Sequence, residues 1–462
     1  MRQPQTTPST SSSVTMETDE VGDGSGSMST ALGQQNAPAQ SGHLLYSGPL
    51  KKNPYYLPLE EKIDSYTWFK NYVDQNDPYL YETQKPKRSN FGRSSWPNKQ
   101  FKIIWNMPTF QCHKYGLNFS FLTNYGIVVN QGDSFRGDKI ALLYDPGLFP
   151  ALLEANEGSD SVRRNGGVPQ EGDLNHHLDL FAEQIQNKLI PDRDFSGVGI
   201  IDFEHWRPIW NENFGSLAPY RKESRSIEKS RHPYYTNAEV EKEAAKRFEK
   251  AAWQFFHRTL NTAKKLRPKA LWGYYGFPLC FNYTPKNQQA SCTSSVMENN
   301  ERLRWLFEES TAIYPSLYYK KYGMNENTRA AFMKGRMDEA IRVSLRSQSQ
   351  SPVYPYTWLK YYDTKDFVEQ NDLVNSLVIP RKEGAAGVII WGASNDVNTK
   401  QKCQSLDEYV RKIFGPTVER FLQSQKEDVY NLYETSNSSS SKPFTNVETT
   451  LGNGISNVFP PF

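Results

Sequence analysis

Two carboxylates spaced two residues apart, Asp202 and Glu204 in the segment IIDFEHW, could carry out acid–base chemistry. The apolar residues before them predict a buried strand, on which side chains two apart point to the same face. Carboxylates this close cannot both ionise freely, so the pKa of one rises and that group can act as an acid near neutral pH. Most isolated D-x-E pairs are solvated or ion-paired, and the position at the end of a buried strand distinguishes this one.

Polar, acidic and aromatic residues also end most of the other predicted strands. Tyr and Trp combine an apolar ring with a polar tip, which suits the ring faces and hydroxyls of a sugar. An aromatic-rich core is the alternative explanation of the high aromatic content, 13% of residues. The strand ends that favour a carbohydrate site are Trp105-Asn106, Tyr144-Asp145, Tyr274-Tyr275, Tyr318-Tyr319, Tyr361-Tyr362 and Trp391.

Apolar runs alternate along the chain with segments of helical periodicity. Most runs are continuously apolar, as expected of parallel strands covered on both faces. This order predicts an α/β fold, a TIM-like (β/α) barrel of about seven strands, rather than a Rossmann sheet, because no glycine-rich phosphate turn follows the early strands. Active sites of such barrels lie at the C-terminal ends of the strands. The predicted strands are 101–108, 140–146, 197–204, 270–278, 312–319, 352–360 and 386–393.

The segment between Thr236 and Pro268 is the clearest predicted helix. Thr236 can cap its start and Pro268 stops it. Apolar residues form one stripe at 3.6-residue spacing, and weaker stripes run through 297–310, 328–347, 366–378 and 405–423. The stripe comprises Val240, Ala244, Phe248, Ala252, Phe255, Leu260 and Ala263.

Composition divides the chain of 462 residues into one domain and two tails. Residues 1–42 and 433–462 are polar and are predicted to be disordered, because they cannot bury enough apolar surface to fold. Residues 43–432 show no break in composition and are predicted to form a single catalytic domain. A net charge of +3 does not indicate nucleic-acid binding, and no apolar run is long enough for a transmembrane segment.

The geometry of the carboxylate pair restricts which glycosidase mechanism it can serve. A retaining glycosidase with two carboxylates needs them on opposite sides of the sugar. Asp202 and Glu204 approach from the same side, so Asp202 is poorly placed as a nucleophile. The remaining retaining route is substrate-assisted: the N-acetyl carbonyl of the sugar attacks its own anomeric carbon, Glu204 protonates the leaving oxygen, and Asp202 orients the acetamido group.

Several long segments, in order along the chain, resemble the hyaluronidases of glycoside hydrolase family 56, and most closely the insect-venom type. The resemblance implies an endo-β-N-acetylglucosaminidase that cuts hyaluronan on a seven-stranded barrel by the substrate-assisted route, without a cofactor. The segments are IIWNMPTFQCHKYG, LLYDPGLFPALL, RRNGGVPQEG, FSGVGIIDFEHWRPIW, LWGYYGFPLCFN and VIIWGASNDVNTKQKC.

The resemblance also implies roles for individual residues. Glu204 matches the acid/base and Asp202 the residue that positions the acetamido group. Ala393 departs from the pattern, since relatives have Ser in the IIWGSS block, and one hydroxyl contact is therefore expected to be missing. The other matching positions, all implied to bind substrate, are Tyr275, Tyr318, Trp391, Tyr144, Asp145 and Arg207.

Four cysteines allow three disulfide pairings. Their spacing favours a local Cys280–Cys292 bond and a long Cys112–Cys403 bond, and the family pattern agrees. The alternative is four free thiols in a cytosolic protein.

Sequons at Asn118, Asn282 and Asn437 weakly favour a secreted glycoprotein. The given N-terminus lacks the apolar region of a signal peptide, so the export route is not apparent from it. We expect a monomer.

Two groups of basic residues have less specific interpretations. None of the histidines has a metal-ligand spacing such as HExxH, so no metal site is predicted, and the pair His176-His177 is expected on a solvated helix face. A basic run after the Asp202 strand is expected either to be a solvated loop or to attract a polyanionic glycan. It comprises Arg221, Lys222, Arg225, Lys229 and Arg231.

Three functions are consistent with these patterns. The first is hyaluronan hydrolysis and the second is hydrolysis of chondroitin, a polymer that differs chiefly at the amino sugar and its sulfation. The third is a non-catalytic glycan-binding or allergen-like protein, which would have no need to retain both Asp202 and Glu204.

Overall fold

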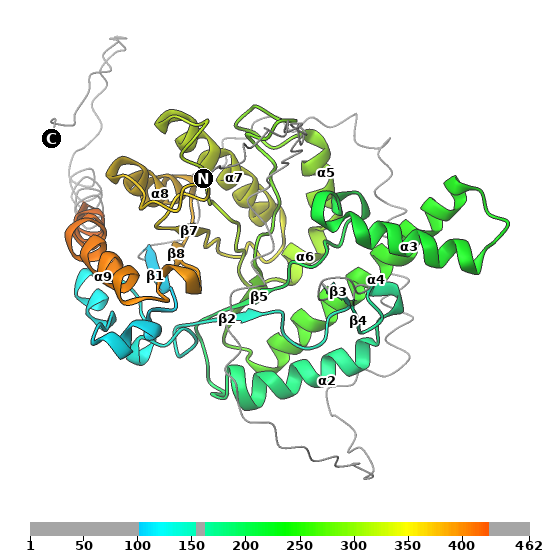
Figure 1. Ribbon diagram of the computed structural model, residues 1–462, viewed down its shortest axis with the longest axis horizontal. Coiled ribbons are helices and arrows are strands. Elements are labelled where there is room, and N and C mark those ends of the chain that lie inside the picture. Colours follow the sequence, from blue (N-terminus) through cyan, green and yellow to red (C-terminus); the bar gives the residue numbers. More distant parts are fainter. Residues whose placement is uncertain (1–100, 154–161, 425–462) are drawn as a thin grey trace, which may run out of the picture.

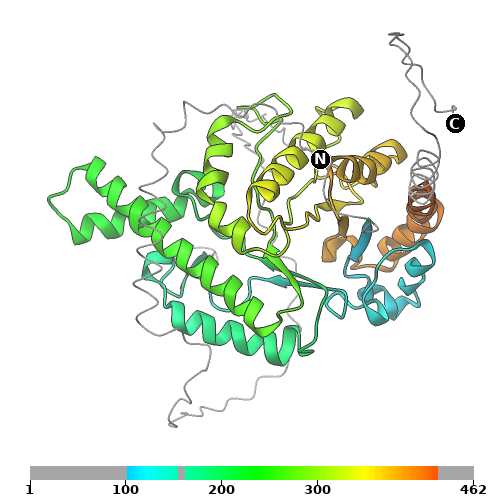
Figure 2. The same cartoon turned by 180° about the vertical axis from the view of Figure 1, so that it is seen from behind.

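The computed structural model describes residues 101–153 and 162–424. The predicted tails, both boundaries of the predicted domain and the sequon at Asn437 lie outside these residues. Within them, parallel strands lie at the centre and helices surround them, as Figures 1 and 2 show.

Six parallel strands form two sheets. One sheet has the order β2-β5-β6 and the other β1-β8-β7, and an antiparallel pair, β3-β4, lies apart from both. The strands are β1 (Lys102–Asn106), β2 (Ile140–Tyr144), β3 (Ala151–Leu153), β4 (Val162–Arg164), β5 (Val198–Asp202), β6 (Leu271–Tyr274), β7 (Tyr356–Trp358) and β8 (Gly387–Trp391).

The predicted strand at 312–319 is wrong. This segment makes only isolated parallel bridges, from Tyr314 to Tyr275 on one side and from Ile313 and Ser316 to the β7 side on the other. Pro315 interrupts it and has no amide hydrogen for a ladder. The segment therefore joins the two sheets without extending either, and among the described residues the hydrogen-bonded ring of a barrel is not closed. The predicted strand number remains a prediction.

Alternation along the parallel strands produces two cores. Ile104, Leu142, Ile200 and Ile389 belong to an inner cluster that also contains residues of 312–318. Their neighbours in sequence point outward into a larger cluster shared with the helices. Both faces of each strand are therefore buried, which explains why the runs are apolar throughout instead of alternating.

Helices follow the predicted stripes closely. Helix α4 spans Asn237–Leu266 and begins with a capping box, in which Thr236 and Glu239 bond each other's backbone amides. All the residues of its predicted stripe are buried. The other helices are α2 (Leu174–Gln184), α3 (Ala218–Arg231), α5 (Ser294–Arg302), α6 (Arg304–Glu309), α7 (Glu326–Arg346), α8 (Gln370–Glu383) and α9 (Lys400–Tyr409).

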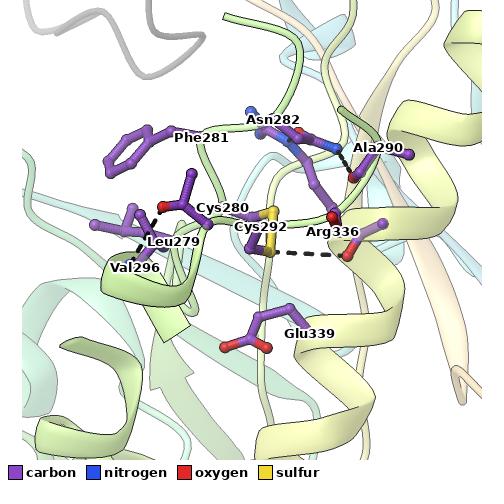
Figure 3. Close-up of a disulfide and its surroundings, with 12 residues drawn as sticks. Leu279, Cys280, Phe281, Asn282, Ala290, Cys292, Val296, Arg336 and Glu339 are labelled. Carbon is purple, nitrogen blue, oxygen red and sulfur yellow. Dashed lines mark hydrogen bonds between the residues drawn. A yellow bond between two sulfur atoms is a disulfide. The ribbon is translucent and has the colours of Figure 1, made fainter. Parts of the chain in front are cut away.

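Two disulfides form, with the predicted pairing. Cys112–Cys403 joins residues separated by 291 positions, and Cys280–Cys292 closes a local loop shown in Figure 3. No helix among the described residues is long and apolar enough to cross a membrane.

Candidate active site

A cavity of about 1400 Å³ opens where the parallel strands end. All the sequence-predicted catalytic and substrate-binding residues except Arg207 line it. The register explains this convergence, because Tyr144 at the end of β2 is the pairing partner of Asp202 at the end of β5, and Trp391 at the end of β8 pairs with both Asn106 and Trp358.

Asp202 and Glu204 form a hydrogen-bonded carboxylate pair in the cavity. Asp202 is only 8% exposed. Burial, reinforced by the negative charge of Asp145, raises the pKa of Asp202 to about 7, although the hydrogen bond with Glu204 works in the opposite direction. The pair therefore holds a proton near neutral pH, which is the property that a catalytic acid requires.

Asp145 lies beside this pair and is held as an anion. Its amide donates to the carbonyl of Asp202 at 2.7 Å, and its backbone has a positive φ of 41°. Arg164 at the end of β4 forms a two-pronged ion pair with the Asp145 carboxylate, and His205 Nε2 lies 3.3 Å from its Oδ2. Although burial opposes the effect, the hydrogen bonds from His205 and Arg164 lower the pKa of Asp145.

Helix α2 fixes the turn that carries Asp145. The amide of Gly147 donates to Gln184 Oε1 at 2.7 Å, and the amide of Leu148 donates to His177 Nδ1 at 2.8 Å. The Nε2 of His177 is 2.8 Å from Thr259 Oγ1, on α4. Burial lowers the pKa of His177 to about 3, so this histidine is neutral and serves as an acceptor for the turn. The prediction of a solvated helix face is thus wrong for His177.

Aromatic side chains form the rest of the wall near the carboxylates. Trp391 stacks on Tyr318, with ring centroids 5.5 Å apart, and donates its Nε1 hydrogen to the hydroxyl of Tyr144 at 2.8 Å. Tyr275 lies beside Tyr318, at a centroid distance of 6.4 Å. Burial, together with the charge of Glu204, raises the pKa of Tyr275 well above its usual value, so its hydroxyl remains a hydrogen-bond donor.

Comparison with known proteins decides the family. The hyaluronidase model of glycoside hydrolase family 56 matches residues 92–427. The chain belongs to the hyaluronidase family. It is therefore a glycosidase, and its relatives include a hyaluronidase of Apis mellifera, 45% identical over 70% of this chain and 84% of that protein. A hyaluronidase of Vespa magnifica is 43% identical over 71% of this chain and 91% of that protein.

A solved hyaluronidase structure agrees with the sequence comparison. Bee venom hyaluronidase in complex with a hyaluronic acid tetramer superimposes with a TM-score of 0.67, at 44% identity, over 69% of this chain and 99% of that one. The architecture of the described residues is thus the architecture of this hyaluronidase.

Arg207 does not lie in the hyaluronidase cavity, contrary to its expected place in the groove. Its side chain is 9% exposed, and its guanidinium lies over the rings of Phe214 and Phe281. One of its nitrogens donates to the carbonyl of Glu212 at 3.0 Å. Arg207 therefore supports the loop after β5 instead of facing the cavity.

The sequon at Asn282 is buried in this fold, whereas a glycosylated asparagine has to be exposed. Asn282 is 1% exposed, and its amide nitrogen donates to the carbonyls of Ala290 and Phe332. Arg336 donates to its oxygen at 3.0 Å, so a glycan on this nitrogen would break the network seen in Figure 3. Asn118, by contrast, is exposed.

The basic run after β5 does not line the hyaluronidase cavity either. It forms helix α3 and not a loop, and with α4 it projects from one side of the molecule in Figures 1 and 2. Arg221 and Arg225 both pair with Glu241, and Arg231 pairs with Glu171. These positive charges are therefore used within the protein.

Sequence reasoning assigned no role to Arg164 or His205, which together hold Asp145. His205 directly follows Glu204, and Arg164 precedes Asn165 and Gly166, both of which have positive φ. A charged residue directly before a turn of this kind is the sequence signal that could have identified Arg164.

Proposed function

We propose that this chain hydrolyses the β-1,4 bonds of hyaluronan as a retaining endo-β-N-acetylhexosaminidase. Glu204 is the acid/base and Asp202 positions the acetamido group. The observation that carries the proposal is the hydrogen-bonded pair of Asp202 and Glu204 in the cavity, with the pKa of Asp202 raised by burial. The hyaluronic acid tetramer bound to bee venom hyaluronidase supports hyaluronan as the substrate.

In the first step, the acetamido oxygen of the sugar bonds to the anomeric carbon while the glycosidic bond breaks. Glu204 gives its proton to the leaving oxygen, and Asp202 accepts the acetamido N–H and stabilises the positive charge of the cyclised intermediate. In the second step, Glu204 removes a proton from water, the water oxygen bonds to the anomeric carbon and the acetamido group is restored. The configuration at that carbon is retained.

The state of the other nearby carboxylate supports this route over an enzyme nucleophile. Arg164 and His205 occupy the oxygens of the Asp145 carboxylate, which makes it a poor nucleophile. Tyr275, Tyr318 and Trp391 supply ring faces and donors for the sugar that is cut. Tyr144 and Asp145 extend the same wall.

We also propose that the protein is secreted. Both disulfides are typical of an oxidising compartment, and the exposed Asn118 sequon can accept a glycan. The similarity to a venom enzyme agrees with export.

Depolymerisation of hyaluronan, followed by size-exclusion chromatography across pH 4 to 7, tests the enzymatic proposal. Wild type should shorten the polymer, and Glu204→Gln should lower the rate by at least about 10²- to 10⁴-fold, because a positioned general acid contributes that much. Glu309→Gln, which removes a carboxylate paired with Lys264 outside the cavity, is the matched control and should act like wild type. Folded wild type that cuts neither hyaluronan nor chondroitin would favour a non-catalytic glycan-binding protein.

A further inference from the structure

The 3₁₀ helix after β1 presents two ring side chains to the cavity. This helix, η2, spans Thr109–Tyr115, and residues three apart lie on the same side of a 3₁₀ helix. Phe110 and His113 have that spacing, and both line the cavity. The proposed reaction uses neither side chain. We call these two residues the rim platform.

Phe110 is exposed although its side chain is apolar. The residue is 45% exposed, and it belongs to none of the hydrophobic clusters of the described residues. Single exposed apolar residues are ordinary on a protein surface. Of the large apolar residues that are exposed in the described part of the chain, however, Phe110 is the one that lines the cavity.

Contacts on both sides of Phe110 fix its backbone. The hydroxyl of Thr109 donates to Asp133 Oδ1 at 2.7 Å, and Gln111 Nε2 donates to Ser394 Oγ at 3.2 Å. The disulfide to α9 starts at the residue after Gln111. Because the backbone is already held, the ring of Phe110 loses little conformational freedom when a ligand packs on it.

A buried carboxylate holds the second ring of the rim platform. The Nε2 atom of His113 is 3.0 Å from Asp133 Oδ2, which also accepts from the amide of Phe119 at 3.2 Å. Asp133 is buried, whereas the side chain of His113 is 36% exposed. The imidazole is therefore anchored at one edge and accessible from the cavity.

The rim platform follows the wall that contacts the cleaved sugar. Asn106, at the end of β1, is the pairing partner of Trp391, and η2 begins shortly after Asn106. Trp391 is hydrogen-bonded to Tyr144, the pairing partner of Asp202. A glycan that extends from the carboxylates past Trp391 on the β1 side therefore reaches the rim platform.

We propose that the rim platform binds a sugar outside the position where the glycan is cut, and that Phe110 thereby determines how long a glycan must be for tight binding. A β-linked sugar exposes C–H groups on its ring faces, and these pack on an aromatic ring. A glycan too short to pass Trp391 leaves the platform empty. The inference rests on the proposed function for the identity of the glycan.

Binding of a length series tests the inference without catalysis. Full-length Glu204→Gln would be titrated, by fluorescence anisotropy, with labelled hyaluronan oligosaccharides from the disaccharide to the dodecasaccharide. Adding Phe110→Ala should weaken binding by about 3- to 10-fold above one particular length, the loss expected for one aromatic contact. Oligosaccharides below that length should bind as before.

Three further substitutions, each combined with Glu204→Gln, locate the effect. Phe110→Trp keeps an aromatic ring at the rim and should preserve tight binding of the long oligosaccharides. His113→Gln keeps a donor for Asp133 but removes the second ring, and should weaken the same oligosaccharides by less than Phe110→Ala does. Tyr322→Ala removes an exposed aromatic ring outside the cavity and should change nothing.

Two results overturn the inference. An equal loss at every length would mean that Phe110 acts on the cleaved sugar or on the fold, and unchanged binding of all lengths would mean that its ring is not used. Wild type that shows the length-dependent loss with Phe110→Ala but cuts no glycan would refute the proposed function and leave the inference standing.

Discussion

The two three-stranded sheets bring opposite charges to opposite parts of one cavity. The β2-β5-β6 sheet ends in the carboxylates of Asp202 and, one residue beyond β2, Asp145. The β1-β8-β7 sheet ends in Trp391 and Trp358, and three lysines that follow its strands line the same cavity, Lys360, Lys365 and Lys402. The carboxylates are crowded and buried, so their pKa values move in opposite directions. The carboxylates at the end of the β2-β5-β6 sheet can exchange protons, while the lysines that follow the β1-β8-β7 sheet provide fixed positive charge.

Among the substitutions that test this difference between the two sheets, removing the charge of Asp202 should have the largest effect, a fall in kcat. Asp202→Asn keeps the shape of the side chain but cannot stabilise the charged acetamido intermediate, so kcat should fall by about 10²- to 10³-fold. Steady-state kinetics on hyaluronan measures this. The substrate-assisted assignment fails if the variant turns over at the wild-type rate.

The same substitution should change how stability depends on pH. In the folded state the Asp202–Glu204 pair keeps one proton up to about pH 7, whereas unfolded Asp202 releases its proton near pH 3.8. Between these values the folded state binds more protons, so wild type loses stability as pH rises. We expect Asp202→Asn to match wild type at pH 4 and to exceed it by about 1–4 kcal/mol at pH 8.

Thermal unfolding across that pH range measures the difference. Asp194→Asn, at an exposed position where Lys269 lowers the pKa, is the control and should show no gain at pH 8. A constant offset between Asp202→Asn and wild type at all pH values would show that the carboxyl has no raised pKa in the folded state.

The next largest effect is expected from breaking the ion pair between Arg164 and Asp145, which should lower the stability of the fold. Both side chains are largely buried, so Arg164→Gln leaves a carboxylate poorly compensated and should cost about 1–3 kcal/mol in the free energy of unfolding. Arg163→Gln breaks a neighbouring pair with Glu223 in which the arginine is 60% exposed, and should cost less than about 0.5 kcal/mol. Chemical denaturation compares the two; similar costs would mean that Arg164 does not hold Asp145.

The smallest expected effect concerns the aromatic wall that joins the two regions. Trp391→Phe keeps an aromatic side chain but removes the hydrogen bond to Tyr144, so KM should rise by about 2- to 5-fold while kcat changes little. Combining it with Tyr144→Phe in a double-mutant cycle isolates that hydrogen bond. Fully additive effects would show that the bond does not contribute to substrate binding.

Local patterns along the chain predicted much of this structure. The run before Asp202 and the capped helix that starts after Thr236 are confirmed, because periodicity and capping depend on neighbours in sequence. The cysteine pairing is confirmed as well: the short spacing favours the local Cys280–Cys292 bond, which leaves Cys112 and Cys403 to pair with each other. The residues expected around the cavity converge there because parallel strands end on the same side. These features required no knowledge of long-range packing.

The errors come from contacts between distant segments. No residue near His177 in sequence indicates that Thr259 and the amide of Leu148 contact its ring. Asn282 has the sequence of a sequon, but in the fold Arg336 and the carbonyls of distant residues surround its side chain. Arg207 was expected in the groove, yet a backbone carbonyl and two aromatic rings hold it elsewhere. Whether a polar side chain is buried depends on hydrogen-bonding and packing partners that are distant in sequence, which local patterns do not indicate.

The Cys112–Cys403 bond makes the described domain a covalent ring, because the bridge joins the loop after β1 to helix α9 across 291 positions. A protease that cuts the backbone once between these residues therefore produces two fragments that remain attached. Such a nicked protein would run as a single band on a non-reducing gel and separate only after reduction. Limited proteolysis of this chain should for that reason be analysed under both conditions.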